Sequence, residues 1–186
     1  MADVIFGKVN PSARLPLTIP NMENEMGLSP AQYPGIDKVA EYTEGMYVDY
    51  RWYVANSVQP AYPFGHGLSY TAFSYGAVEI KQEGVSRDGE VSVEVKNEGK
   101  IAGAEVVQMY VTYPPAANAP QRQLKGFQKT AVLQGGASET VVMPLRKQDL
   151  RTWDPELHEW SLWPGTYTVS IGASSEDIRL TTQFQV

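Results

Sequence analysis

The sequence predicts an all-β protein: an antiparallel β-sandwich preceded by an extended, mostly irregular N-terminal arm. From residue 73 onward, apolar and polar residues alternate with a period of two, and turn signals recur about every ten residues. No helical pattern separates these segments, which excludes a parallel βαβ architecture. Before residue 70 the pattern is lost, and prolines at 30, 34, 60 and 63 interrupt the chain.

The arm is expected to hold one short helix, at 2–6, which Gly7 can end. A turn-rich extended stretch follows at 10–16, and 21–29 is polar. Residues 42–53 are dense in Tyr and Trp, which predicts packing on another surface; a platform for stacking sugars is the alternative. The run Pro63 to Thr71 (PFGHGLSYT) is interpreted as a rigid linker into the first strand.

The strands are predicted from alternation and from β-branched and aromatic content. Val91, Val93 and Val95 alternate with polar residues, and 104–113 (AEVVQMYVTY) is typical of a central strand. One helical turn is expected at 147–150. The expected strands are 73–80, 91–96, 104–113, 123–130, 138–145, 160–163, 165–173 and 178–186.

Composition limits the function. The formal charge of -6 and the pI near 5.0 argue against nucleic acid, and no basic run favours an anionic membrane. No stretch of about 18 apolar residues is present, and the first residues lack the cationic segment of a signal peptide. With no cysteine and two histidines, we expect no disulfide, no metal site and no cofactor.

No catalytic residue is assigned from the sequence. Ser69 with His66 as its base, and His158 separately, are the candidates, since acyl transfer needs an activated nucleophile. However, no Gly-x-Ser-x-Gly elbow is present, so structural roles are favoured for all three. Large aromatic residues are favoured as packing anchors, and stacking on a sugar is the alternative; the candidates for it are Trp52, Tyr53, Trp160 and Trp163.

Four cationic residues are interpreted structurally. Arg14 and Arg51 are expected to anchor the arm through ion pairs or hydrogen bonds. Arg122 and Lys125 are expected on a solvated strand edge, where charge blocks edge-to-edge association.

Several segments together resemble the C-terminal end of family 3 glycoside hydrolases, the β-glucosidase and β-xylosidase family. They run in the family's order: 6–16, 44–53, 63–71, 95–99, 103–110, 123–127, 164–167 and 172–180. The resemblance implies a fibronectin type III/immunoglobulin-like sandwich at 71–186. It also implies that 1–70 is a remnant of an α/β sandwich domain plus a linker arm. Lys8, Ala13 and Asp49 depart from the family's usual Asp, Gly and Gly.

The resemblance also implies a function. The family's nucleophile lies on an N-terminal barrel, and its acid/base precedes the region matched here, whereas retaining chemistry needs both carboxylates. We therefore expect an accessory region that braces the parent's catalytic domains and shapes the cleft, and that forms a homodimer through the arm when isolated. A small serine hydrolase or esterase using Ser69 and His66, and a carbohydrate-binding module, remain the alternatives.

Overall fold

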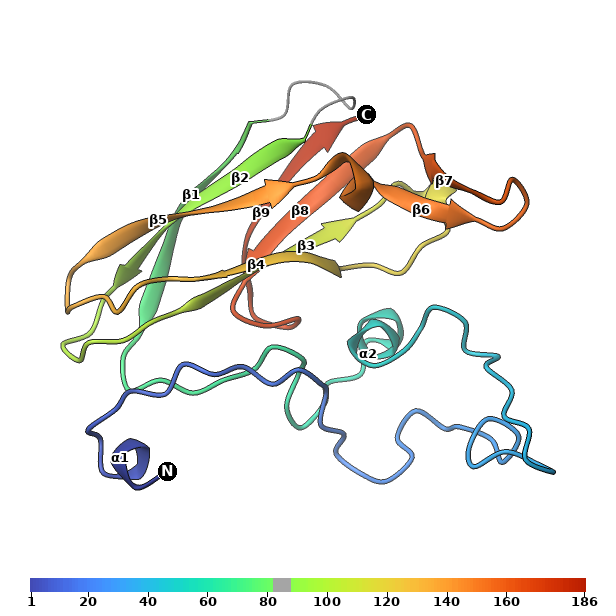
Figure 1. The fold of residues 1–186 in the computed structure, drawn as a ribbon, viewed down its shortest axis with the longest axis horizontal. Coiled ribbons are helices and arrows are strands. Elements are labelled where there is room, and N and C mark those ends of the chain that lie inside the picture. Colours follow the sequence, from blue (N-terminus) through green and yellow to red (C-terminus); the bar gives the residue numbers. More distant parts are fainter. Residues whose placement is uncertain (82–87) are drawn as a thin grey trace.

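In the computed structural model, which describes residues 1–81 and 88–186, two antiparallel sheets face each other (Figure 1). The first sheet has the order β1-β2-β5, with β1 at Phe73–Lys81, β2 at Gly89–Asn97 and β5 at Ser138–Leu145. The second has the order β4-β3-β8-β9. Its strands are β3 at Val106–Thr112, β4 at Gln123–Lys129, β8 at Thr166–Gly172 and β9 at Ile178–Gln185. The predicted antiparallel sandwich is confirmed.

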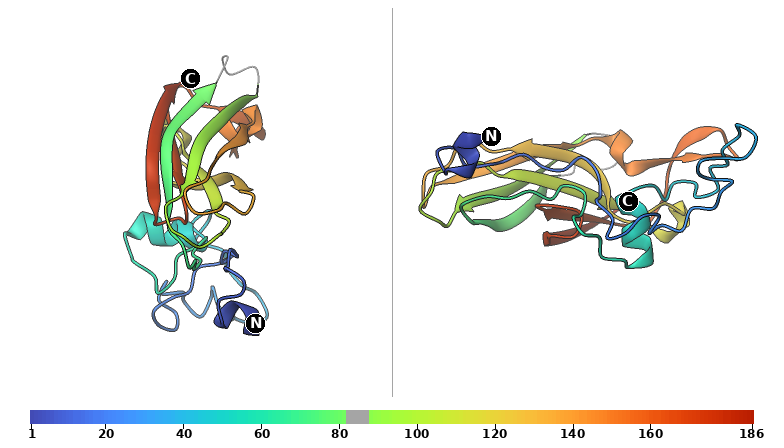
Figure 2. Two further views of the ribbon diagram at one scale, coloured as in Figure 1. Left: turned by 90° about the vertical axis from the view of Figure 1, so that its left-hand side faces the viewer. Right: turned by 90° about the horizontal axis from the view of Figure 1, so that it is seen from below.

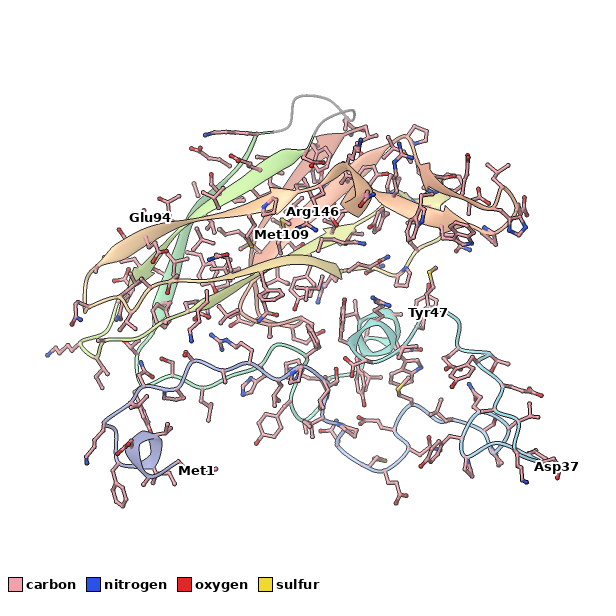
Figure 3. The ribbon with its side chains drawn as sticks, in the orientation of Figure 1. Met1, Asp37, Tyr47, Glu94, Met109 and Arg146 are labelled. Carbon is pink, nitrogen blue, oxygen red and sulfur yellow. The ribbon has the colours of Figure 1, made fainter. Side chains whose placement is uncertain are left out.

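The core lies between the sheets and follows the predicted period of two. Along β2, residues alternate between buried and exposed, with Val91, Val93 and Val95 inside. Met109 of β3 is fully buried and lies between the two layers (Figure 3). Burying such side chains stabilises the fold by about 1.5–3 kcal/mol each. The largest fully buried side chains are Tyr110, Tyr167, Met109, Met143, Leu145, Leu150 and Ile171.

A small hairpin is inserted between the sheets' strands β5 and β8. It consists of β6 at Arg151–Asp154 and β7 at Glu159–Leu162, after a helical turn, η2, at Lys147–Leu150. The helical turn was predicted, but β6 was not. The hydroxyl of buried Tyr167, near the start of β8, lies 3.0 Å from the Leu150 carbonyl oxygen. This tyrosine corner, known from immunoglobulin-like sandwiches, fixes the base of the hairpin.

The arm, residues 1–70, runs beneath the sandwich along its long axis (Figure 2). It contains two helices, α1 at Ala2–Ile5 and α2 at Tyr50–Asn56. The first was predicted. The second was not, because Tyr, Trp and Val favour helices weakly. It forms because Tyr50 is buried against the rings of Phe64 and Tyr110, at centroid distances of 4.8 and 6.1 Å.

The loop between β3 and β4 holds one further helical turn, η1, at Pro115–Ala117. No helix among residues 1–81 and 88–186 is both long and apolar enough to cross a membrane.

Candidate functional site: the junction of arm and sandwich

The linker run 63–71 is the point at which the arm is fixed to the sandwich. Four successive backbone carbonyls of this run each accept a hydrogen bond. Two donors belong to the sandwich: Ser175 N to the Phe64 carbonyl at 2.9 Å and Gln108 Nε2 to the Gly65 carbonyl at 3.1 Å. Two belong to the arm: Leu15 N to the His66 carbonyl at 2.8 Å and Arg14 to the Gly67 carbonyl at 3.0 Å. The linker thus joins the start of the arm to strands of the second sheet.

Two glycines of this run are required by close approach. Gly65 has a φ of 82°, and a Cβ there would lie 2.1 Å from the Gln108 side chain. A Cβ at Gly67 would lie 2.4 Å from the Ala13 carbonyl oxygen. Close packing therefore explains the Gly-His-Gly motif: the backbone at Gly65 lies against the side-chain amide of Gln108, and the backbone at Gly67 lies against the backbone of Ala13.

The strongest polar contact of the junction is the ion pair between Arg14 and Glu105. The side chains are 14% and 4% exposed, so the pair is buried. Glu105 also accepts a hydrogen bond from the amide of Val106 at 2.8 Å. The prediction that Arg14 anchors the arm is confirmed, since it also binds the Gly67 carbonyl. A charged pair so desolvated is costly to break from one side only.

Further contacts extend the junction in both directions. The Leu124 amide donates to the Tyr50 hydroxyl at 2.9 Å, which ties α2 to β4. Lys129 Nζ lies 2.7 Å from Ser12 Oγ, and Asn10 Nδ2 donates to the Ala102 carbonyl at 3.1 Å. Between these contacts lies a largely apolar cavity of about 430 Å³.

The three candidate catalytic residues lie in different environments. The Ser69 hydroxyl donates to Asn10 Oδ1 at 3.1 Å and accepts from the Thr71 amide at 3.2 Å. The His66 ring lies 5.2 Å from that of Tyr62. Within the described ranges no hydrogen bond joins His66 to Ser69. His158 is exposed in the β6–β7 turn, with a φ of 53°.

The four aromatic candidates comprise one exposed, two half-buried and one buried residue. Trp160 is 58% exposed, whereas Tyr53 is buried and donates to Glu25 Oε2 at 3.0 Å. Burial, with the Glu25 carboxylate, raises the pKa of Tyr53 to about 12. Trp52 packs against Tyr53, and Trp163 packs on the core and donates to Thr152 Oγ1 at 2.8 Å. In this chain, Trp160 is therefore the candidate free to stack on a ligand.

Among residues 1–81 and 88–186, no three His, Asp or Glu side chains converge as metal ligands would.

Asp49 occupies a backbone conformation that suits glycine. Its φ is 55° and its ψ is -134°, directly before α2. In return, its carboxylate accepts hydrogen bonds from the amide and the hydroxyl of Thr18, both at 2.9 Å. Ala13, the other position at which the family's usual glycine is absent, is not among the residues with positive φ.

Replacing Asp49 separates these two effects. Asp49→Ala loses both hydrogen bonds and keeps the strain, so we expect a loss of about 2 kcal/mol in unfolding free energy. Asp49→Gly also relieves the strain and should be about 1 kcal/mol more stable than the alanine variant. Urea denaturation measures both. Asp37→Ala is the matched control, because Asp37 has a φ of 50° and lies on the exposed arm. If the Asp49→Ala variant were as stable as the Asp49→Gly variant, backbone strain at residue 49 would be refuted.

Comparison with known proteins gives one consistent result. Residues 1–70 match the glycosyl hydrolase family 3 C-terminal domain, and residues 105–175 match the fibronectin type III-like domain. The chain is 39% identical over 204 residues to probable β-glucosidase D of Aspergillus niger. It is 40% identical over 189 residues to thermostable β-glucosidase B of Acetivibrio thermocellus. Both alignments cover 100% of the chain but only 26% and 25% of the relative.

Solved structures agree with the sequence comparison. DesR, a β-glucosidase from Streptomyces venezuelae, superposes with a TM-score of 0.92 at 37% identity, over 100% of this chain and 24% of DesR. For β-glucosidase 3B from Thermotoga neapolitana the TM-score is 0.91 at 38% identity, over 100% of this chain and 26% of that one. The chain thus spans about a quarter of the length of the relatives it matches.

The fold and the junction define the class: a fibronectin type III-like sandwich to which an arm that matches the glycosyl hydrolase family 3 C-terminal domain is bound. The chain belongs to the C-terminal region of the family 3 glycosyl hydrolases, and the catalytic domain of those enzymes is absent from it.

Proposed function

We propose that this chain is the accessory region of a β-glucosidase-type enzyme, in which the arm and sandwich together brace the catalytic domains and shape the rim of the cleft. The proposal rests on the match to β-glucosidases over the whole chain. It also assigns the catalytic domains of the parent enzyme as the partner of the arm.

One observation carries the proposal: the arm buries very little of its own apolar surface. Its buried residues are Thr18, Tyr50, Tyr53, Pro60 and Gly65. Large apolar side chains are instead exposed along it, including Phe6 at 81%, Tyr42 at 83% and Tyr33 at 74%. Met1 and Asp37 mark two extremities of this arm, away from the sandwich (Figure 3). Such a surface is typical of a protein contact.

The proposed boundary divides the chain into 1–70, the remnant of an α/β sandwich domain with its linker, and 71–186, the sandwich. Two facts support it. The family 3 C-terminal match ends at residue 70, and β1 begins at Phe73.

The same exposed surface leads us to propose that the isolated chain forms a homodimer through the arm. Sedimentation equilibrium measures this directly. The protein concentration should be about 100 µM, because weak dimers dissociate in the micromolar to millimolar range. A chain that is still monomeric at that concentration would rule the dimer out.

A hydrolase in its own right is not favoured. The Ser69 hydroxyl donates to Asn10, and within the described ranges it has no hydrogen bond to His66 that would activate it. Substituting Ser69 or His66 with alanine should leave the isolated chain as inactive on short-chain esters as before.

A chimera tests the bracing role. The C-terminal quarter of the Acetivibrio thermocellus enzyme would be replaced by this chain, and two exposed arm residues would be changed, by Ile36→Ser and Tyr42→Ser. In the isolated chain both changes should alter stability by less than about 0.5 kcal/mol, because the side chains are 57% and 83% exposed. In the chimera each should cost about 1–3 kcal/mol, because the side chains become buried.

Val142→Ser on β5 is the matched control, with a side chain 48% exposed on the sandwich. It should be neutral in both proteins. We expect the chimera to hydrolyse p-nitrophenyl β-glucoside and the isolated chain not to. Equal effects of Ile36→Ser and Tyr42→Ser in the two proteins would contradict the proposal, as would glycoside turnover by the isolated chain.

A further inference from the structure

A cleft of about 570 Å³ lies on the sandwich, and all of its lining residues belong to 71–186. It is formed by β4, the helical turn η2 and the β6–β7 hairpin; Arg146, directly before η2, is labelled in Figure 3. Its lining residues are Lys125, Lys147, Gln148, Asp149, Arg151 and Trp160.

The cleft concentrates positive charge in a chain whose net charge is -6. Lys125, Lys147 and Arg151 line it, and none of them forms an ion pair within residues 1–81 and 88–186. The nearby carboxylates are engaged by backbone amides. Asp149 accepts from the Arg146 amide at 2.9 Å, and Asp88 accepts from the Lys147 amide at 2.8 Å. The lining therefore holds three cations, Lys125, Lys147 and Arg151, against one carboxylate, Asp149, which leaves an excess of positive charge for a bound anion.

The surroundings of Lys125 also favour a bound anion. Sequence alone predicts Lys125 on a solvated strand edge. Strand β4 is an edge strand, but the Lys125 side chain is half-buried, and its ammonium lies 5.5 Å from the centroid of the Tyr113 ring. Burial lowers the pKa of Lys125; the Asp149 carboxylate opposes this effect and the Arg51 guanidinium adds to it. An anion bound beside Lys125 would offset that cost.

Trp160 supplies an apolar wall next to these cations. Its side chain is 58% exposed, and its ring is held edge-on against Trp153 at a centroid distance of 5.9 Å. The Arg151 guanidinium donates to the Trp160 carbonyl oxygen at 2.9 Å, which keeps the guanidinium close to this residue. The cleft thus presents a large aromatic surface and several charged donors together.

We propose that this cleft binds a saccharide that carries a carboxylate, a uronic acid at the end or within a short oligosaccharide. The apolar face of a sugar ring stacks on Trp160, and the carboxylate pairs with Lys147 and Arg151, with Lys125 behind them. A neutral sugar would leave the cations unpaired, and an inorganic anion would leave the indole uncovered. An acidic sugar has both an apolar ring face for Trp160 and a carboxylate for the cations.

Titration of the whole chain with a trigalacturonate, followed by Trp fluorescence and calorimetry, tests the proposal. The trimethyl ester of the same oligosaccharide, which has the same rings without charge, is the matched ligand. We expect saturable binding of the acid, at least about tenfold weaker binding of the ester, and weaker binding of the acid at 1 M salt.

Two variants assign the binding to this cleft. Lys147→Gln should weaken binding of the acid about 3- to 10-fold, the effect of one charge-assisted hydrogen bond at a partly exposed site. Trp160→Ala should abolish the fluorescence response and weaken binding by at least as much. Lys100→Gln, which removes the same charge from an exposed turn elsewhere, should have no effect.

Three results would overturn the inference: no binding of the acid at millimolar concentration, equal binding of acid and ester, or binding of inorganic phosphate as tight as that of the acid. This site lies outside the arm, so the bracing role and the acidic-sugar site can fail independently. The chimera measures only the first and the titration only the second.

Discussion

Glu105→Ala is expected to lower the free energy of unfolding by about 3–5 kcal/mol, the largest effect of any single change at the junction. The variant leaves the Arg14 guanidinium, whose side chain is 14% exposed, without its carboxylate partner. It also removes the acceptor of the Val106 amide. Urea denaturation measures the loss, and hydrogen exchange at the Leu15 amide, bonded to His66, shows whether the arm is released first.

Two controls show whether burial of the charge is the cause. The double variant Arg14→Met with Glu105→Leu removes both charges and should recover most of the stability. The pair Lys96–Glu98 has side chains 47% and 46% exposed, and Lys96→Ala should cost less than about 1 kcal/mol. If Glu105→Ala also cost less than 1 kcal/mol, the ion pair would not be the anchor of the arm.

Asn97→Ala is expected to destabilise the sandwich by about 3 kcal/mol, since a buried polar group left without its partner costs about 1–3 kcal/mol. The Asn97 side chain is fully buried and joins three segments. Its amide donates to Ile101 and Leu133 at 2.8 and 2.9 Å. Its carbonyl accepts from Thr71 at 2.6 Å and from the Gly99 amide at 3.0 Å.

Asn97→Asp tests whether the donors of this residue matter. The substitution keeps the shape and the accepting oxygen but turns a second oxygen toward the carbonyls of Ile101 and Leu133. At neutral pH the loss should be at least as large as for alanine, because a buried carboxylate is then unpaired. Asn56→Ala, at the exposed end of α2, is the control and should be within about 0.5 kcal/mol of the native chain.

Sequence alone predicted what short-range patterns encode. The period of two at Val91, Val93 and Val95 fixes which face of β2 is buried, because successive strand residues point to opposite sides. The turn signals and the eight segments that resemble the family are likewise recognised from consecutive residues. Alternation does not identify which tryptophans are covered: core packing was favoured for Trp160, which is 58% exposed.

What sequence could not predict depends on partners distant in the chain. Arg14 was expected to anchor the arm, but nothing local names Glu105, 91 residues away. Helix α2 is stabilised by Tyr50 packing on Tyr110, a contact that its own residues do not encode. Lys125 was expected to be solvated on a strand edge; β4 is an edge strand, but the side chain is half-buried and its ammonium lies 5.5 Å from the centroid of the Tyr113 ring.

The separation between junction partners has a consequence for synthesis of the chain. Arg14 precedes Glu105 by 91 residues, and Tyr50 precedes Leu124 by 74. The Phe64 carbonyl likewise binds an amide, that of Ser175, which is synthesised much later. Translation proceeds at about 5–20 residues per second, so the arm leaves the ribosome roughly 5–20 seconds before its partners exist. Throughout that interval its Tyr- and Phe-bearing segments face water. The nascent chain is therefore most prone to aggregate while the sandwich is still unmade, and slower translation would lengthen that exposure.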